Sequence, residues 1–246
     1  MSSCTFTRRE QRLIARLRTP LQVQRWLNAL PYNAEPEGDT QRSFRTVVAL
    51  GTAHCMEAAL SAAVILEAHG WPPLVMSLES EDQLDHVVFV YRTTAGWGSI
   101  ARSRDPGLHG RKPAFRTLRD LACSYVEPYV DVSGRITGYG VLDLRTLGRY
   151  DWRCSPRHLW HVEQVLIDLP HRAIRSSEAR ISRLRSRYHA FMAAHPGFKP
   201  LHYAGQEWWH PLPGVFASSV RLHRQLSRRR VETPTARKRI GDENQR

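Results

Sequence analysis

A run of small and apolar residues in the first third of the chain limits the fold more than any other feature. Residues 56–66 are rich in alanine and apolar on nearly every side. A helix without a polar face has to be buried all round. Gly70 ends this helix, and Trp71-Pro72-Pro73 prevents its continuation, because proline lacks the N–H that a helix needs. The rest of the chain therefore has to surround one central helix.

The residues after the central helix predict an antiparallel sheet. Residues 74–78 have the composition of a strand, and a polar turn follows at 79–84. The β-branched and aromatic residues at 86–91 predict a second, buried strand. A hairpin-type turn at 93–96 leads into a third strand at 97–103. The predicted fold class is α+β, with one helix packed on an antiparallel meander.

Further helices are expected on both sides of this core. Helical spacing and a threonine–proline start predict two helices before it, at residues 7–17 and 20–30. After it we expect helices at 117–126, 155–167 and 176–194, with a strand at 136–144 on the edge of the sheet. Because the chain has no internal repeat and no clean linker, it is assigned one domain over residues 1–220, with its core at 45–130 and a tail at 221–246.

The composition is that of an ordinary globular protein, with 41% hydrophobic and 24% charged residues. The chain has no run of about 18 apolar residues, so no transmembrane helix is predicted. The polar start of the chain does not resemble a secretory signal. The four cysteines (Cys4, Cys55, Cys123 and Cys154) are scattered without framework spacing. Their spacing predicts reduced thiols, and together these features predict a cytoplasmic protein.

The net charge of +13 favours anionic partners. Residues 221–246 contain nine basic and three acidic residues, so an excess of six positive charges lies in the tail. One interpretation of this tail is the capture of nucleic acid or of a membrane surface. The alternative, which blocks of like charge favour, is a solvated chain end without a partner.

Cys55 and His86 form the most reactive pair that the sequence suggests. Cys55 begins the central helix, where the partial positive charge of the helix end would stabilise a thiolate and the Cys55 backbone N–H would face an oxyanion. His86 opens the second strand, in a position to face that helix end. Such a pair performs acyl transfer through a thioester. The alternative is a small buried cysteine and a core histidine, each of which is common by itself.

The run from Gly51 to Trp97 resembles the transglutaminase-like superfamily, which belongs to the papain-like fold. The matching motifs are Cys55-Met56-Glu57-Ala58-Ala59 at the helix start, His86-Val87-Val88-Phe89-Val90-Tyr91, and Gly96-Trp97-Gly98-Ser99-Ile100. The likeness covers residues 45–130 and is strongest to uncharacterised bacterial members. It implies a cysteine-dependent hydrolase or acyltransferase that acts on amide bonds of a peptide or protein. It implies fold better than activity.

The chain departs from this family where an aspartate usually orients the histidine. Ala101 stands at the matching position after Trp97. Ser99 and Ser103 should share a face with Trp97, and Ser103 is the residue that we assign to this role. A weakened enzyme and a catalytically degenerate binding module are therefore both open, and a nucleic-acid-binding protein driven by the tail is a third hypothesis.

The other carboxylates near this position are weaker candidates for orienting the histidine. Asp105 belongs to an Asp-Pro-Gly turn, and Asp85 should point to the opposite face of its strand from His86.

Three weaker clusters complete the set of candidate sites. Cys154, His158 and His161 offer only half of a zinc-type ligand set, so no metal is predicted. No cofactor is predicted either, because the chain has neither a P-loop nor a dinucleotide-binding glycine pattern. His54 is interpreted as a turn residue beside the pocket. The Trp208-Trp209 pair is interpreted as a clamp on the core, with base stacking as the alternative.

Overall fold

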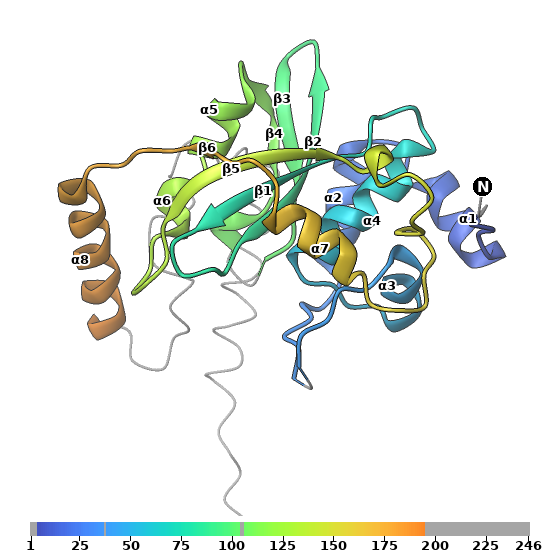
Figure 1. Cartoon of the computed structure of the whole chain (residues 1–246), viewed down its shortest axis with the longest axis horizontal. Helices are drawn as coiled ribbons and strands as arrows, with labels where there is room; N and C mark the ends of the chain where they lie inside the picture. Colours follow the sequence, from blue (N-terminus) through green and yellow to red (C-terminus); the bar gives the residue numbers. More distant parts are fainter. Residues whose placement is uncertain (1–3, 37, 104–105, 195–246) are drawn as a thin grey trace, which may run out of the picture.

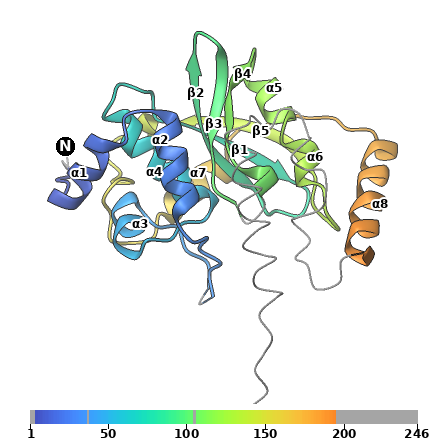
Figure 2. The ribbon, with the colours of Figure 1, turned by 180° about the vertical axis from the view of Figure 1, so that it is seen from behind.

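The computed structural model describes residues 4–36, 38–103 and 106–194, which form one antiparallel sheet with helices on both faces (Figures 1 and 2). The fold class is α+β, as the sequence predicts. The strands are β1 (Leu74–Ser80), β2 (His86–Thr93), β3 (Gly96–Ile100), β4 (Arg111–Phe115), β5 (Ile136–Asp143) and β6 (Arg172–Ala173). Their order across the sheet is β4-β3-β2-β1-β5-β6, and every neighbouring pair is antiparallel.

The helices divide between the two faces of the sheet. They are α1 (Arg8–Arg16), α2 (Pro20–Ala29), α3 (Phe44–Leu50), α4 (Cys55–Glu67), α5 (Leu118–Cys123), α6 (Val126–Tyr129), α7 (Trp160–Ile167) and α8 (Glu178–Ala194), with short 3-10 turns η1 (Pro106–Leu108) and η2 (Leu144–Leu147). One hydrophobic core lies between the sheet and α1 to α4 with α7, and a second lies between the sheet and α5 with α6. The sheet is therefore buried on both sides.

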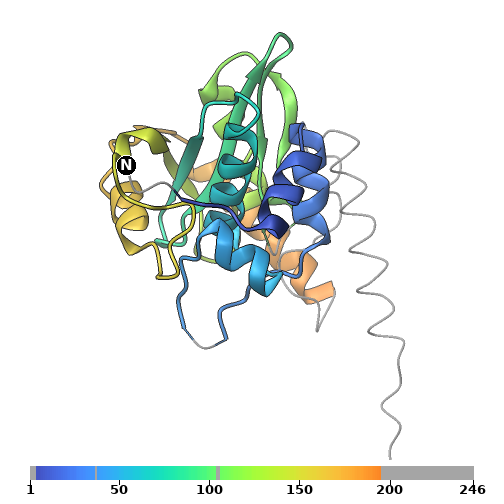
Figure 3. The same cartoon turned by 90° about the vertical axis from the view of Figure 1, so that its right-hand side faces the viewer.

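Helix α4 is the central helix that the sequence predicts. Every residue from Met56 to Leu66 is buried. Phe89 of β2 belongs to the same core, while its neighbours Val88 and Val90 belong to the core on the other face of the sheet, as the alternation of a strand requires. Figure 3 shows α4 in front of the sheet with the N-terminal helices beside it. This packing holds the first residue of α4 close to the first residue of β2.

Several predicted elements differ from the observed ones. The third strand, predicted to continue to residue 103, ends at Ile100 in the structure. The helix predicted at 117–126 is divided into α5 and α6. Helix α7 begins at Trp160, later than predicted. Helix α3, which Ser43 caps, and strands β4 and β6 were not predicted. Strand β5 is not an edge strand, because β6 pairs with it. The missed strands are short, and they depend on pairing with a neighbouring strand, which local composition does not encode.

The prediction of four reduced thiols is wrong for one pair. Cys4 and Cys154 form a disulfide across a sequence separation of 150 residues, with Cα atoms 5.8 Å apart, while Cys55 and Cys123 are free. No spacing pattern announces this bond, because the fold alone brings the start of the chain against the segment before α7. The compartment stays a prediction.

Other predictions fall outside what the structure describes or stay at a coarse level. Within the described residues, no helix is both long and apolar enough to cross a bilayer. The Trp208-Trp209 pair, the end of the predicted domain and the tail at 221–246 lie outside the described residues. Helix α8 lies at the end of the molecule opposite α1, and it packs Ile181 and Leu184 against Val130 (Figure 1).

Candidate active site

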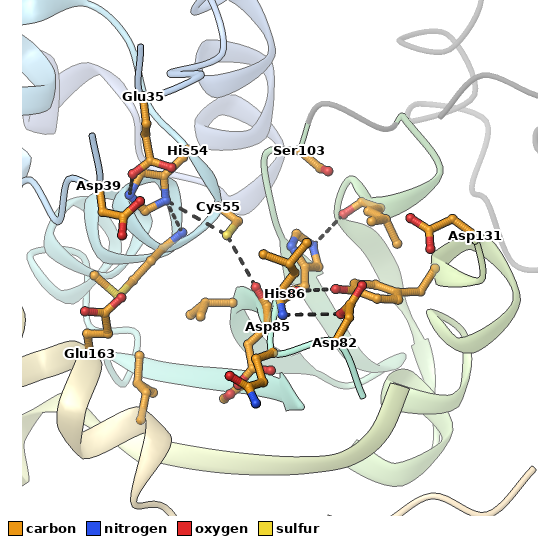
Figure 4. Close-up of a pocket in the computed structure, with 18 of the residues that line it drawn as sticks. Glu35, Asp39, His54, Cys55, Asp82, Asp85, His86, Ser103, Asp131 and Glu163 are labelled. Atoms are coloured by element: carbon orange, nitrogen blue, oxygen red, sulfur yellow. Dashed lines mark hydrogen bonds and ion pairs between the residues drawn. The ribbon is translucent and has the colours of Figure 1, made fainter. Parts of the chain in front are cut away.

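A cavity of about 380 Å³ opens where α4 and β2 both begin. Cys55 and His86 line it together, so the structure brings the predicted pair to one site. Figure 4 shows Cys55 between the imidazoles of His54 and His86. Ser103 also lines this cavity. The long segments before α4, between β1 and β2, and after α6 supply most of the remaining wall.

The start of α4 is fixed by a capping box that also positions Cys55. His54 is the N-cap residue, and its Nδ1 accepts the backbone N–H of Met56 at 3.3 Å. The carboxylate of Glu57 accepts the backbone N–H of His54 at 3.0 Å. The N–H groups of the first turn have no acceptor within the helix, so Cys55 lies at the positive end of the helix dipole.

Cys55 has the surroundings of a thiolate. Its side chain is half-buried, and its Sγ lies 4.0 Å from His54 Nδ1 and 3.9 Å from the backbone oxygen of Asp85. Burial raises the pKa of the Cys55 thiol, but hydrogen bonds and positive charge from His54 and His86 outweigh it and hold the pKa well below its usual value. The two imidazoles therefore supply what a nucleophilic cysteine needs.

His86 is buried and held in one orientation. Its Nε2 lies 2.9 Å from the carbonyl oxygen of Leu108, and its ring meets Tyr125 edge-on with centroids 5.8 Å apart. A carbonyl only accepts hydrogen bonds, so Nε2 carries a proton. In the neutral ring Nδ1 is then the nitrogen that can take a proton from a thiol or return one to a leaving group.

The structure gives His86 Nε2 a main-chain acceptor, the Leu108 carbonyl, and the orienting role assigned to Ser103 stays a prediction. Ser103 lines the cavity, and its backbone oxygen accepts from Arg102 and His109, while His86 Nε2 donates to Leu108. The position of an orienting carboxylate is taken by main chain because η1 turns the Leu108 carbonyl toward β2.

The position expected for an aspartate is occupied by a different interaction. Ala101 is fully buried, its N–H donates to Gln24 Oε1 at 3.0 Å, and its carbonyl accepts from Gln24 Nε2 at 2.8 Å. The hydroxyl of Ser99, the other serine on this face, forms a hydrogen bond with the Tyr125 hydroxyl at 2.6 Å. Asp85 Oδ1 accepts the N–H of Ser80 at 2.9 Å, so this carboxylate stabilises the turn between β1 and β2. Asp105 lies outside the described residues.

His54 is a residue of the candidate site whose contact with Cys55 was not predicted from the sequence. Its Nε2 lies 2.6 Å from the Thr40 carbonyl and 3.4 Å from Glu57 Oε1. Burial alone would lower the pKa of His54, but the Cys55 thiolate, Glu57 and the Thr40 carbonyl raise it to about 9. When neutral, Nδ1 accepts from Met56, and when charged, its proton faces the sulfur of Cys55. The available signal was a histidine at an N-cap position directly before a cysteine.

The predicted half of a metal site has other uses in the structure. Cys154 is bonded to Cys4, and His158 Nδ1 accepts the backbone N–H of Gln41 at 3.0 Å. The ring of His161 packs against Tyr150. These contacts leave the cavity at Cys55 as the candidate site.

Comparison with known proteins does not name a family for the chain. No family model matches it, and no curated protein does either. The chemistry of the cavity is therefore what indicates the function.

Proposed function

We propose that the protein is a cysteine-dependent hydrolase or acyltransferase that acts on an amide bond of a peptide or protein. We also propose that its core is papain-like and that the chain is a member of the transglutaminase-like superfamily. One observation carries the proposal: a half-buried cysteine begins a buried helix, inside a cavity, between two imidazoles that lower its pKa. We retain the cytoplasm as the expected compartment.

The geometry supports a two-step acyl transfer. The Cys55 thiolate would attack the amide carbonyl carbon while the Cys55 backbone N–H and the end of α4 face the developing oxyanion. The imidazolium of His86 would give its Nδ1 proton to the departing amine, which leaves a thioester on Cys55. Water or a second amine would then attack the thioester, and His86 would take up the proton of that nucleophile as the thiolate leaves. Hydrolysis and transamidation differ only in this last nucleophile.

Thiol reactivity provides the first test. Iodoacetamide labelling with mass mapping measures Cys55 and Cys123 in the same chain, with Cys123 as the internal control for an ordinary thiol. We expect Cys55 to react faster at neutral pH and to keep reacting as the pH falls below the range in which Cys123 stops. We also expect p-nitrophenyl acetate to leave an acetyl group on Cys55. A Cys55 rate that follows that of Cys123 at every pH would contradict the proposal.

A second candidate function is a binding module of the same fold without turnover. It is favoured by one observation, that His86 is oriented by a carbonyl and not by a carboxylate, which leaves an imidazolium less stabilised. A stable acyl adduct on Cys55 that neither water nor added amine removes would support this candidate over the enzyme.

An anionic partner of the basic tail remains a separate proposal. It predicts salt-dependent retention of the full chain on DNA, RNA or anionic vesicles, and loss of that retention when the residues after Val220 are deleted.

A further inference from the structure

We propose that the cavity at Cys55 selects a basic peptide segment, in which lysine or arginine side chains flank the amide bond that reacts. The inference rests on the proposed function for the peptide nature of the ligand. Its own evidence is the charge of the cavity wall. Six carboxylates contribute to that wall (Glu35, Asp39, Asp82, Asp85, Asp131 and Glu163). Among the described residues, neither lysine nor arginine lines the cavity.

The negative charge of the cavity wall is opposite in sign to the net charge of the whole chain. The chain has 36 lysine and arginine residues and only 23 acidic ones. A cavity wall drawn at random from this surface would carry more positive than negative charge. Instead, six carboxylates place negative charge on the cavity wall, beyond the two imidazoles that flank Cys55. A cationic side chain would be attracted to this cavity although the chain as a whole repels it.

The cavity carboxylates also lack the arginine partners that other carboxylates have. Away from the cavity, arginines pair with acidic residues of the surface and helices, such as Glu67, Glu127 and Asp143. In the described parts of the chain, no lysine or arginine forms an ion pair with any of the six cavity carboxylates. Glu35 lies 3.7 Å from His54 Nε2, and its hydrogen bonds from Thr40 come from uncharged donors. Their negative charge is therefore available to a ligand.

Two buried acceptors in the cavity wall point to a hydrogen-bond donor in the ligand. Gln41 is 4% exposed, and its Nε2 donates to Glu163 at 2.5 Å. Because a carboxylate only accepts, this contact identifies the nitrogen of the Gln41 amide, and the other atom of the amide is the acceptor Oε1. Within the described residues, neither Gln41 Oε1 nor the hydroxyl of fully buried Ser77 has a hydrogen-bond partner. A buried acceptor without a donor is costly, and an ammonium, guanidinium or peptide N–H would satisfy it.

The spacing of the carboxylates favours an extended ligand over a single metal ion. In the described residues, the only set of three ligating groups within 4.8 Å of one another is Cys4, Asp151 and Cys154, which lies outside the cavity. Figure 4 shows Asp39 and Glu163 on one side of Cys55, and Asp82 and Asp131 on the other. Several separate cationic side chains of one peptide match this arrangement. Burial and the nearby negative charge of Glu79 and Cys55 also raise the pKa of Asp85. A bound cation would stabilise the charged form of this carboxylate.

Peptide binding to the full chain with Cys55→Ala tests the inference, because this variant binds without reacting. The probes are three labelled peptides of equal length with blocked ends, which carry lysine, serine or glutamate at the same positions. Fluorescence anisotropy gives Kd for each. We expect the lysine peptide to bind at least about tenfold more tightly than the serine peptide, and the glutamate peptide to bind most weakly.

Charge-neutral variants locate the effect. Asp39→Asn with Glu163→Gln removes two cavity carboxylates and keeps an acceptor oxygen for Gln41, and we expect it to weaken lysine-peptide binding about tenfold. Glu127→Gln with Glu178→Gln removes two carboxylates that face arginines elsewhere, and Kd should stay unchanged. Thermal melts confirm that both variants fold.

Three outcomes would contradict the inference. The first is an equal Kd for the three peptides, and the second is an equal loss of lysine-peptide affinity in both double variants. The third is binding of calcium in the cavity that the lysine peptide does not compete with. The iodoacetamide test is independent of this result. If Cys55 is an ordinary thiol but the lysine preference and its location hold, the proposed chemistry fails and the cavity still selects basic peptides. If Cys55 is activated and the peptides bind alike, only the inference fails.

Discussion

The Nε2 of His86 donates a hydrogen bond to the carbonyl oxygen of Leu108 at 2.9 Å, and this contact sets the proton arrangement of the site. It leaves Nδ1 as the nitrogen that can exchange a proton with Cys55. His54 adds a second imidazole from the other side, with Nδ1 4.0 Å from the sulfur. The cysteine therefore has one histidine held by a main-chain carbonyl and one held by the cap of its own helix.

The two histidines should have separable effects. With p-nitrophenyl acetate as acyl donor, we expect His86→Gln to abolish turnover, because Nδ1 of His86 handles the proton of the leaving group and of water. His54→Gln should lower the iodoacetamide rate of Cys55 at neutral pH several-fold and keep measurable turnover, because His86 still lowers the thiol pKa. Equal turnover in both variants would contradict this division of roles.

The stability of the folded protein should be nearly independent of pH between about 6.5 and 9. The pKa of His54 is raised from 6.5 to about 9, so its contribution is fully present below 6.5 and is lost as the pH rises toward 9. The pKa of Cys55 is lowered from 9.0, so its contribution is present above 9.0 and is lost as the pH falls. The two slopes have opposite signs and oppose each other in this range, which flattens the pH dependence.

Removing one partner should expose the slope of the other. In His54→Gln the cysteine contribution stands alone, because His86 still holds its pKa down. The free energy of unfolding, from urea titrations at several pH values, should then rise with pH by up to about 1.4 kcal/mol per unit. A variant as flat as the wild type, or a wild type as steep as the variant, would contradict the assignment.

Ala101→Asp, which introduces the aspartate expected from the family resemblance, should not produce a carboxylate that orients His86. Ala101 is fully buried in an apolar cluster, and Gln24 already uses both of its backbone groups. Ala101→Asp should therefore destabilise the fold by about 3 kcal/mol or more, because an unpaired carboxylate is buried. Ala101→Asn is the control for volume, and a smaller loss for Asn would identify charge as the cause. An increase in turnover for Asp would contradict the prediction.

The central helix should depend strongly on its buried leucines. Leu60 is fully buried in α4, and Leu60→Ala should lower the free energy of unfolding by about 2–5 kcal/mol. Leu50 at the end of α3 is 57% exposed, so Leu50→Ala is the matched control and should change stability by about 0.5 kcal/mol or less. Urea titrations give both values. Similar losses at the two positions would mean that α4 is not the centre of the core.

The Cys4–Cys154 disulfide should stabilise the isolated protein. Cys154→Ser should lower the free energy of unfolding by about 2–4 kcal/mol, because the bond restricts the unfolded chain across 150 residues. Cys123→Ser is the control, since Cys123 is free and half-buried, and it should have little effect. An unchanged stability of Cys154→Ser under oxidising conditions would show that the link contributes nothing.

The sequence by itself determined the elements whose signals are local. The apolar surface of residues 56–66 gave α4, and the β-branched run at 86–91 gave β2, because helix burial and strand preference follow from neighbouring residues. Cys55 and His86 could be named for the same reason, since each opens one of these elements.

Tertiary structure decided the relations between distant segments. The Leu108 carbonyl that orients His86 is a main-chain atom, which carries no side-chain signature, and Ser103 was chosen only by strand alternation. Cys4 and Cys154 meet because the fold closes a long loop. The cavity carboxylates lie on segments far apart in the chain, so their common negative field exists only after folding. Electrostatic interactions act through space, and only the tertiary structure brings these groups together.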